Sequence, residues 1–94
     1  MEVTEVKITL MNEDKLKAFA NITLDNEFVI RDLKVINGKE RYFVSMPNKR
    51  RKDGVFQDIA HPITREMRQK IEEAVLNEYT KVKNQNVTSQ QSAE

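Results

Sequence analysis

The sequence predicts an α+β fold, an antiparallel β-meander of four to five strands followed by one long C-terminal helix. Three observations lead to this prediction. Apolar and polar residues alternate with a period of two in residues 4–10 and again in residues 16–24, as in strands that bury one face. Asn37-Gly38 is a strong hairpin signal, because both residues tolerate the positive φ of a type I′ turn. Beyond Thr64, apolar residues recur at helical spacing.

The first two predicted strands each have one apolar face. In residues 4–10 the even positions are mostly apolar, and the polar cluster at 12–15 then indicates a turn. The second strand, residues 16–24, places five apolar side chains on one face: Leu16, Ala18, Ala20, Ile22 and Leu24. Such strands belong to a sheet that packs on a core with one side only.

The third and fourth strands follow a turn at residues 25–27. In residues 28–36, apolar residues occupy both even and odd positions. This pattern predicts an interior strand covered on both faces. Residues 41–46 form the returning strand, and Pro47 ends its ladder because proline lacks an N–H donor. Residues 47–63 are expected to be mostly loop, with a short strand at 55–59 left open.

Thr64 is a suitable N-cap for the predicted helix. The helix extends about 20 residues, and Glu66 can pair with Lys70 on its outer face. Its apolar positions are Met67, Ile71, Ala74, Val75, Tyr79 and Val82. Residues 1–83 are therefore expected to form a single domain, and the polar residues 84–94 a disordered tail.

One helix covers a sheet face only partly, and a meander keeps two open edges. Pairing of these edges between two copies would cover exposed backbone and apolar surface together. The sequence therefore predicts a homodimer formed by sheet-edge pairing.

Composition narrows the classes of function. The chain has 94 residues and no cysteine, which excludes disulfides and cysteine-based zinc sites. It shows no secretory signal and no apolar run of the roughly 20 residues that cross a bilayer. A soluble, cytoplasmic protein without a membrane partner is expected.

Positive charge is concentrated in the middle of the chain. Residues 41–70 hold eight basic and three acidic residues, a balance of +5, whereas the whole chain has a formal charge of +1. Lys49, Arg50, Arg51 and Lys52 are consecutive. They could be a solvated turn, or a site that binds the phosphates of a polyanion. Arg65 and Arg68, at the start of the helix, could reach base edges or simply be solvated.

Nothing in the sequence indicates an enzyme. His61 precedes Pro62, where a structural hydrogen bond is the favoured reading. No nucleophile motif and no metal-ligand spacing occur, and with two glycines there is no Gly-rich phosphate loop. No cofactor, metal or small-molecule substrate is expected. Tyr42 and Phe43 could stack on bases, but strand aromatics are more often core or cross-strand partners.

The middle of the chain resembles one bacterial family. ITLDNEFVIRDLKVI, FVSMPNKR and DGVFQDIAHPIT, followed by AVLNEY, are similar to stage V sporulation protein G, the septation regulators, from Met1 to about Tyr79. The resemblance implies a small cytoplasmic dimer that binds DNA and RNA site-selectively and regulates septation, cell division, sporulation, virulence or metabolic genes, at transcription or at the message.

The same resemblance implies where nucleic acid binds. Lys49 and Arg50 match the family's Lys-Arg pair, and the adjoining helix region contributes Arg65, Arg68 and Lys70. Arg51 and Lys52 replace the family's usual Thr-Pro and add two cations. Val55 and Gln57 stand where the family usually has glutamate and arginine.

The predicted function is thus a homodimeric regulator that binds double-stranded DNA, RNA or both. The alternative is a protein–protein adaptor of the division or signalling machinery, whose basic segment contacts an acidic partner. The response of DNA and RNA binding to salt separates the two, because only phosphate binding releases condensed counterions.

Overall fold

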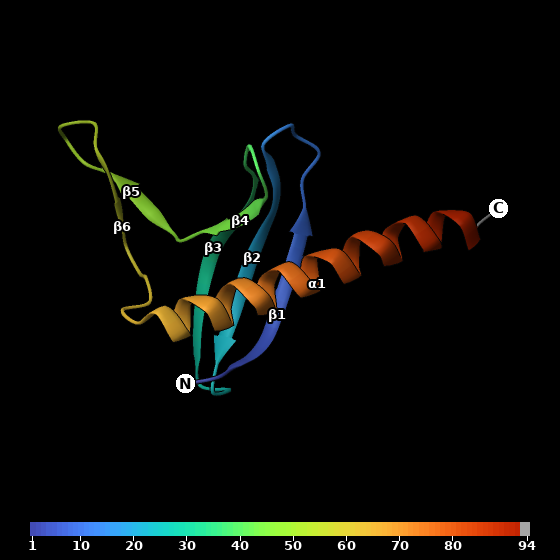
Figure 1. Ribbon diagram of the computed structural model, residues 1–94, viewed down its shortest axis with the longest axis horizontal. Helices are drawn as coiled ribbons and strands as arrows, with labels where there is room; N and C mark the ends of the chain where they lie inside the picture. The colour runs from blue at the N-terminus through green and yellow to red at the C-terminus, as the bar shows by residue number, and fades with distance from the viewer. Residues whose placement is uncertain (93–94) are drawn as a thin grey trace.

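The structure, a computed structural model, describes the backbone of residues 1–92 and the side chains of residues 1–85. Four antiparallel strands form a sheet in the order β1-β2-β3-β4, one helix crosses one face of it, and a two-stranded ribbon extends away (Figure 1). The elements are β1 (Val3–Leu10), β2 (Leu16–Leu24), β3 (Phe28–Asn37), β4 (Tyr42–Ser45), β5 (Asn48–Arg50), β6 (Phe56–Asp58) and α1 (Arg65–Ser92). The predicted α+β fold, a β-meander followed by one C-terminal helix, is confirmed.

The core lies between the sheet and α1. The side chains that fill it are at most 5% exposed and come from β2, β3, β4, the residue after β4, and the inner face of the helix. They are Ala18, Ala20, Ile22, Leu24, Leu33, Val35, Val44, Met46, Ile71, Val75 and Tyr79. The apolar face predicted for β2 and the apolar stripe predicted for α1 therefore meet each other.

Thr64 caps the helix as predicted. Its Oγ1 accepts the Met67 N–H at 3.1 Å, and its carbonyl accepts the Arg68 N–H at 3.1 Å. The helix has 28 residues rather than about 20, because residues 84–92 contain no Gly or Pro to end it. Residues 93 and 94 lie outside the described residues, and disorder of the 84–94 tail in solution stays a prediction. No helix in the described part is apolar over a length that could span a membrane.

The prediction that β3 is covered on both faces is wrong. Phe28 is 64% exposed and Val29 is 48% exposed. Only one face of the strand packs on the core. A bulge in the strand, and not burial of both faces, explains why apolar residues occupy both odd and even positions.

A β-bulge in β3 explains its two apolar parities. From the Ala20–Leu33 pair to the Ile22–Ile30 pair, β3 uses one residue more than β2. Asp32 takes a left-handed conformation there, with φ of 67°. A bulge shifts the alternation by one residue. Apolar residues before and after it therefore face the same core.

The tight turn with positive φ lies between β2 and β3. Asp25 and Asn26 have φ of 51° and 58°, and the Glu27 N–H donates to the Leu24 carbonyl at 2.9 Å. Two consecutive residues with positive φ are typical of a type I′ turn. The turn predicted at residues 25–27 is confirmed.

The type I′ turn predicted at Asn37-Gly38 is wrong. Neither residue has a positive φ, and residues 38–41 make a longer connection that ends in the Gly38 N–H to Arg41 carbonyl bond at 3.0 Å. Glycine is needed there for space. A Cβ on Gly38 would lie 2.8 Å from the Arg41 carbonyl oxygen and 3.1 Å from the Phe43 ring.

Residues 47–63, predicted as mostly loop, contain the ribbon formed by β5 and β6. Its antiparallel register pairs Asn48 with Asp58, Lys49 with Gln57, and Arg50 with Phe56. The short strand left open at 55–59 is therefore present, and it has a partner that the sequence did not indicate. Three-residue strands are too short to show a period.

Candidate nucleic-acid interface

The tip of the ribbon is a defined turn that carries basic residues. The Arg51 N–H donates to the Val55 carbonyl at 2.8 Å, and the Gly54 N–H donates to the Arg51 carbonyl at 3.0 Å. Gly54 has φ of +87°, and Asp53 Oδ1 accepts the Val55 N–H at 3.0 Å. A turn closed by a left-handed glycine is a common hairpin connection. This turn lies within residues 47–63, which the sequence predicted to be mostly loop.

The four consecutive cations are all exposed on this ribbon. Lys49 and Arg50 lie on β5 and point to opposite faces, because strand side chains alternate. Arg51 and Lys52 lie in the turn. Arg51 Nη2 is 3.6 Å from Asp53 Oδ2, and both side chains are more than half exposed, so water and salt screen this ion pair. The ribbon therefore presents a strong local positive charge.

The ribbon stands apart from the rest of the molecule (Figure 1). Within residues 1–92, no Cα of β5 or β6 lies within 8 Å of a Cα of α1 or of the four-stranded sheet. An open hollow of about 450 Å³ lies along it, lined by the four cations and by Gln57, Asp58 and Ile59. A strand of polyanion would meet little steric hindrance there.

The arginines predicted at the helix start are exposed and free of salt bridges within the described residues. Arg65 and Arg68 lie in the first turns of α1. They belong to a different element from the ribbon, more than 8 Å from it between Cα atoms. The ribbon cations and the helix-start arginines are therefore two separate basic groups and not one continuous patch.

Lys70, the third predicted helix residue, is engaged within the molecule. Its Nζ lies 2.8 Å from Glu2 Oε1 and donates to the Met1 carbonyl at 3.4 Å. The predicted Glu66–Lys70 pair is not formed, because the N-terminal segment brings a closer carboxylate. The hydrogen bond and charge of Lys70 hold the pKa of Glu2 below its ordinary value. Lys70 therefore links the helix to the N-terminal segment, and its ammonium group is less available to a ligand than those of the ribbon lysines.

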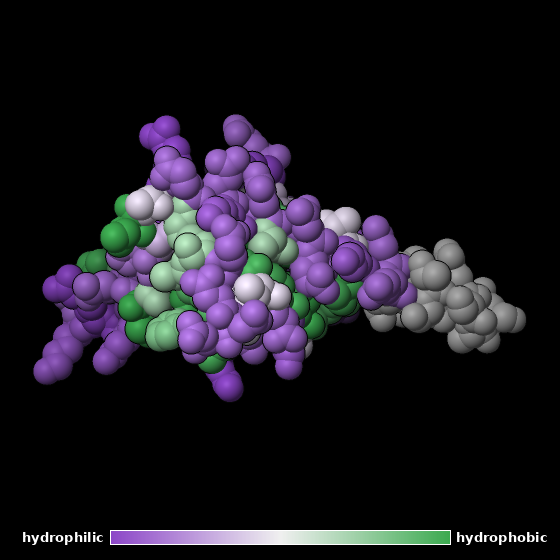
Figure 2. Space-filling model, turned by 90° about the horizontal axis from the view of Figure 1, so that it is seen from below, coloured by the Kyte–Doolittle hydropathy of each residue, from purple (hydrophilic) through white to green (hydrophobic). Residues whose placement is uncertain are grey.

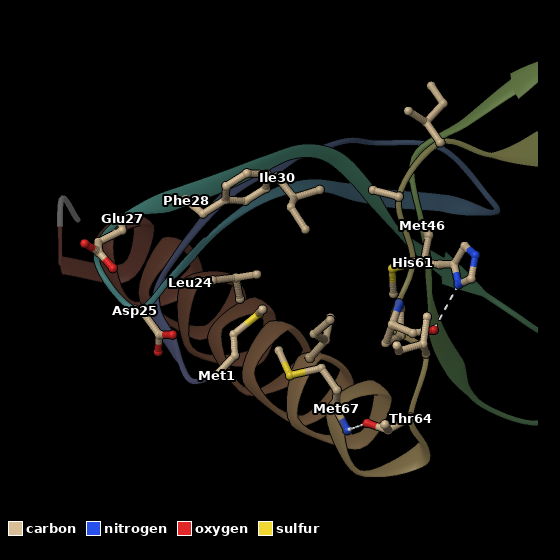
Figure 3. Close-up of a pocket in the computed structure, with 15 residues that line it drawn as sticks. Met1, Leu24, Asp25, Glu27, Phe28, Ile30, Met46, His61, Thr64 and Met67 are labelled. Carbon is tan, nitrogen blue, oxygen red and sulfur yellow. Dashed lines mark hydrogen bonds between the residues drawn. The ribbon is translucent and has the colours of Figure 1, made fainter.

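An apolar hollow lies near the base of the ribbon. It has a volume of about 760 Å³ and separates the start of α1 from the end of the β2–β3 hairpin and from residues 59–64 (Figure 3). Phe28, Ile59 and Ile63 at its edge are 64%, 68% and 91% exposed. Figure 2 shows the corresponding hydrophobic surface beside hydrophilic side chains at this end of the molecule.

His61 borders this hollow from the loop. Its Nδ1 lies 2.9 Å from the Pro62 carbonyl oxygen, so a protonated Nδ1 donates a hydrogen bond there. No cluster of three or more His, Cys, Asp or Glu side chains capable of holding a metal occurs among the described residues. The predicted structural role of His61 agrees with this contact.

Tyr42 is a packing partner, as favoured from the sequence. Its ring meets Tyr79 edge-on at 5.7 Å, and Lys83 Nζ lies about 6 Å from both rings. Burial, together with Tyr42, raises the pKa of Tyr79. Phe43 is 39% exposed on the opposite parity of β4.

Phe56, which the sequence did not single out, lies on the ribbon beside the basic residues. It is 66% exposed and lies opposite Arg50 in the ribbon. The Asp53-Gly54 turn could have indicated it, because a hairpin centred there places residue 56 across from residue 50.

Comparisons with known proteins relate this sequence to one family. The SpoVG family matches residues 1–81 of the chain. The chain belongs to the SpoVG family. A septation protein SpoVG of Anaeromyxobacter sp. strain K is 58% identical over 79 residues, which cover 84% of this chain and 78% of that protein. One from Clostridium kluyveri is 44% identical over 95 residues, 100% of this chain and 99% of its own.

Membership of the SpoVG family confirms the resemblance seen in the sequence. A relative from Bdellovibrio bacteriovorus, also named a septation protein SpoVG, is 58% identical over 81 residues, 86% of this chain and 75% of its own. The matched region 1–81 contains the sheet, the ribbon and most of the helix. Each of these relatives carries the name "Putative septation protein SpoVG".

Proposed function

We propose that this SpoVG-family protein is a regulator that binds DNA and RNA site-selectively and holds phosphate with the ribbon cations Lys49, Arg50, Arg51 and Lys52. The observation that carries the proposal is the placement of these charges. All four are exposed on an element that extends from the body, and among the described side chains only Asp53 forms a salt bridge with one of them. Each phosphate neutralised by a cation releases counterions, which provides the driving force.

Selectivity is assigned to the start of α1. Phosphate contacts position a protein on nucleic acid, whereas contacts to base edges specify the sequence. Arg65 and Arg68 are exposed and could make bidentate contacts to guanine. Lys70 is a weaker candidate, because its ammonium group is already paired with the Glu2 carboxylate at 2.8 Å.

We also propose that two copies act together. β1 and β4 are the outer strands of the sheet, and each leaves one side unpaired. A homodimer joined through such edges would hold two ribbons and up to eight ribbon cations. If about half of them neutralise phosphates on a duplex, log K would fall with log salt at a slope of roughly −3 to −4.

A salt series of fluorescence anisotropy with labelled DNA and RNA tests this function. The K49Q/R50Q/R51Q/K52Q variant should bind all sequences more weakly and show a shallower slope. A matched control, K7Q/K15Q/K39Q/R41Q, removes four exposed cations from the sheet and its loops and should change binding much less. Equal binding by the parent and the ribbon variant would exclude the ribbon as the phosphate site.

The alternative, a protein–protein adaptor, draws support from the apolar hollow and its exposed edge, since exposed apolar patches often mark protein contacts. An adaptor would show little or no anisotropy change with nucleic acid at low salt. It would instead lose its partner on I63E, which replaces the most exposed of these apolar side chains.

A further inference from the structure

Phe56 has an unusual environment for a phenylalanine. It lies in a three-residue strand that is exposed along its whole length, and 66% of the residue is open to solvent. β6 contacts β5 but does not approach α1 or the main sheet within 8 Å between Cα atoms in the described part of the chain. Neither face of the ribbon rests on the core, so the ring does not contribute to it.

The partner of Phe56 across the ribbon is a cation. Phe56 lies directly opposite Arg50, and directly opposite residues in an antiparallel pair project from the same face. The Arg50 guanidinium extends toward the tip of the ribbon, since Nη2 would lie 3.7 Å from a Cβ built on Gly54. One face of the ribbon therefore presents an open aromatic ring, with the Arg50 guanidinium on the same face toward the tip.

A ligand that complements this face needs a flat apolar surface next to a negative charge. An unpaired nucleotide has both, because its base can stack on an aromatic ring while its phosphate meets a cation. In a duplex the faces of interior bases are already stacked on their neighbours, and only edges and phosphates are accessible. The ring thus fits single strands better than duplexes.

We propose that Phe56 is a stacking platform for an unpaired base of single-stranded DNA or RNA, with Arg50 on an adjacent phosphate. This rests on the proposed function, and it adds a preference of the ribbon for unpaired segments. Lys49, Arg51 and Lys52 supply charge to the neighbouring phosphates. Phe56 then separates single strands from duplexes, and the cations supply affinity common to both.

Phe28 shows why the neighbours of Phe56 matter. It is equally open, at 64%, but it lies opposite Leu24 at the edge of the apolar hollow. The apolar pair Phe28–Leu24 beside an apolar hollow is complementary to an apolar protein or lipid surface. The Phe56–Arg50 pair, with the three other ribbon cations, is complementary to a nucleic acid, which has both phosphates and aromatic bases.

Because the chain contains no tryptophan, a single introduced indole reports on its own position. We expect the fluorescence of F56W to be quenched on titration with an unlabelled oligothymidylate of roughly 12 nucleotides. The same titration of F28W, a control of matched exposure, should leave its emission unchanged. A duplex of the same length should quench F56W much less.

Affinity measured on fluorescently labelled oligonucleotides provides the second readout. F56L keeps an apolar side chain and removes the aromatic face, so it should bind the single strand roughly ten- to a hundredfold more weakly and the duplex within about twofold of the parent. F56Y should restore single-strand binding. The ribbon cations are unchanged in all three proteins.

Three results would overturn the stacking role: unquenched F56W in the presence of bound oligonucleotide, equal losses for single strand and duplex in F56L, or F56W emission that shifts on dilution without nucleic acid. The last would place Phe56 in a contact between protein chains. Failure of the parent itself to bind labelled DNA or RNA would instead refute the proposed function, so the two failures are distinguishable.

Discussion

At the scale of single residues, the backbone conformation of Asp32 explains why β3 was wrongly predicted to be covered on both faces. Its φ of 67° belongs to the left-handed region, which is unfavourable for residues with a Cβ, although Asp tolerates it better than most. Asn21 Oδ1 accepts the Asp32 N–H at 3.1 Å and fixes the bulge. The sequence pattern cannot reveal such a shift. Apolar residues at both odd and even positions are expected for a strand buried on both faces, and equally for a strand with a bulge that buries one face only.

Substitutions at this position should depend on backbone preference and not on burial, because Asp32 is exposed. D32G should match or exceed the stability of the parent, whereas D32V should lose about 1–2 kcal/mol, since a β-branched residue is strained at positive φ. Urea unfolding followed by circular dichroism measures both. Equal stability of D32V and the parent would mean that the bulge is not populated in solution.

The Glu2–Lys70 pair predicts a pH dependence at a second residue. The pKa of Glu2 is lowered in the fold from its ordinary value, because Lys70 donates a hydrogen bond to its carboxylate and lies close to it as a positive charge. Its contribution to stability is therefore present above that ordinary value and is lost as pH falls through the lowered pKa. E2Q should be slightly less stable than the parent at pH 7, and this difference should shrink on acidification to about pH 3. The gap between their urea midpoints, compared at the two pH values, measures it, and a gap that widens in acid would contradict the pairing.

At the scale of elements, the long strand β2 and the helix α1 could be predicted from the periodicity of their apolar residues. The pairing of the short strands β5 and β6 could not. β2 and α1 are long enough to display their periods, and their apolar faces are buried as predicted. β5 and β6 have three residues each, so their pairing depends on backbone hydrogen bonds and a turn that periodicity does not report. The four ribbon cations are exposed, as the sequence predicted. Their arrangement on two faces and the position of Phe56 opposite Arg50 follow only from the register.

The helix cap gives an element-scale prediction. T64A removes the hydroxyl that accepts the Met67 N–H at 3.1 Å and should destabilise the protein by about 1 kcal/mol. T80A, on an exposed position inside the same helix, should be neutral or slightly stabilising, because alanine favours helix interiors. Thermal unfolding of both variants checks this. A T64A protein as stable as T80A would show that the cap contributes nothing.

At the scale of the whole molecule, one protomer separates its ribbon from its helix start, so the salt response depends on how many ribbons act together. In the proposed dimer each copy contributes one ribbon to the same nucleic acid. A dimer that keeps the cations of only one ribbon should then show about half the parental slope of log K against log salt, because each neutralised phosphate contributes separately to counterion release.

Mixed dimers test this arrangement. The parent and K49Q/R50Q/R51Q/K52Q are given different affinity tags, co-expressed, and purified through both tags in succession. We expect a mixed species whose slope on duplex DNA is about half the parent value of roughly −3 to −4, while parent homodimers keep the full slope. Recovery of no doubly tagged protein would contradict the dimer, since only an assembly of two copies carries both tags. A mixed species with the full parental slope would instead retain the dimer and remove the second ribbon from the bound complex.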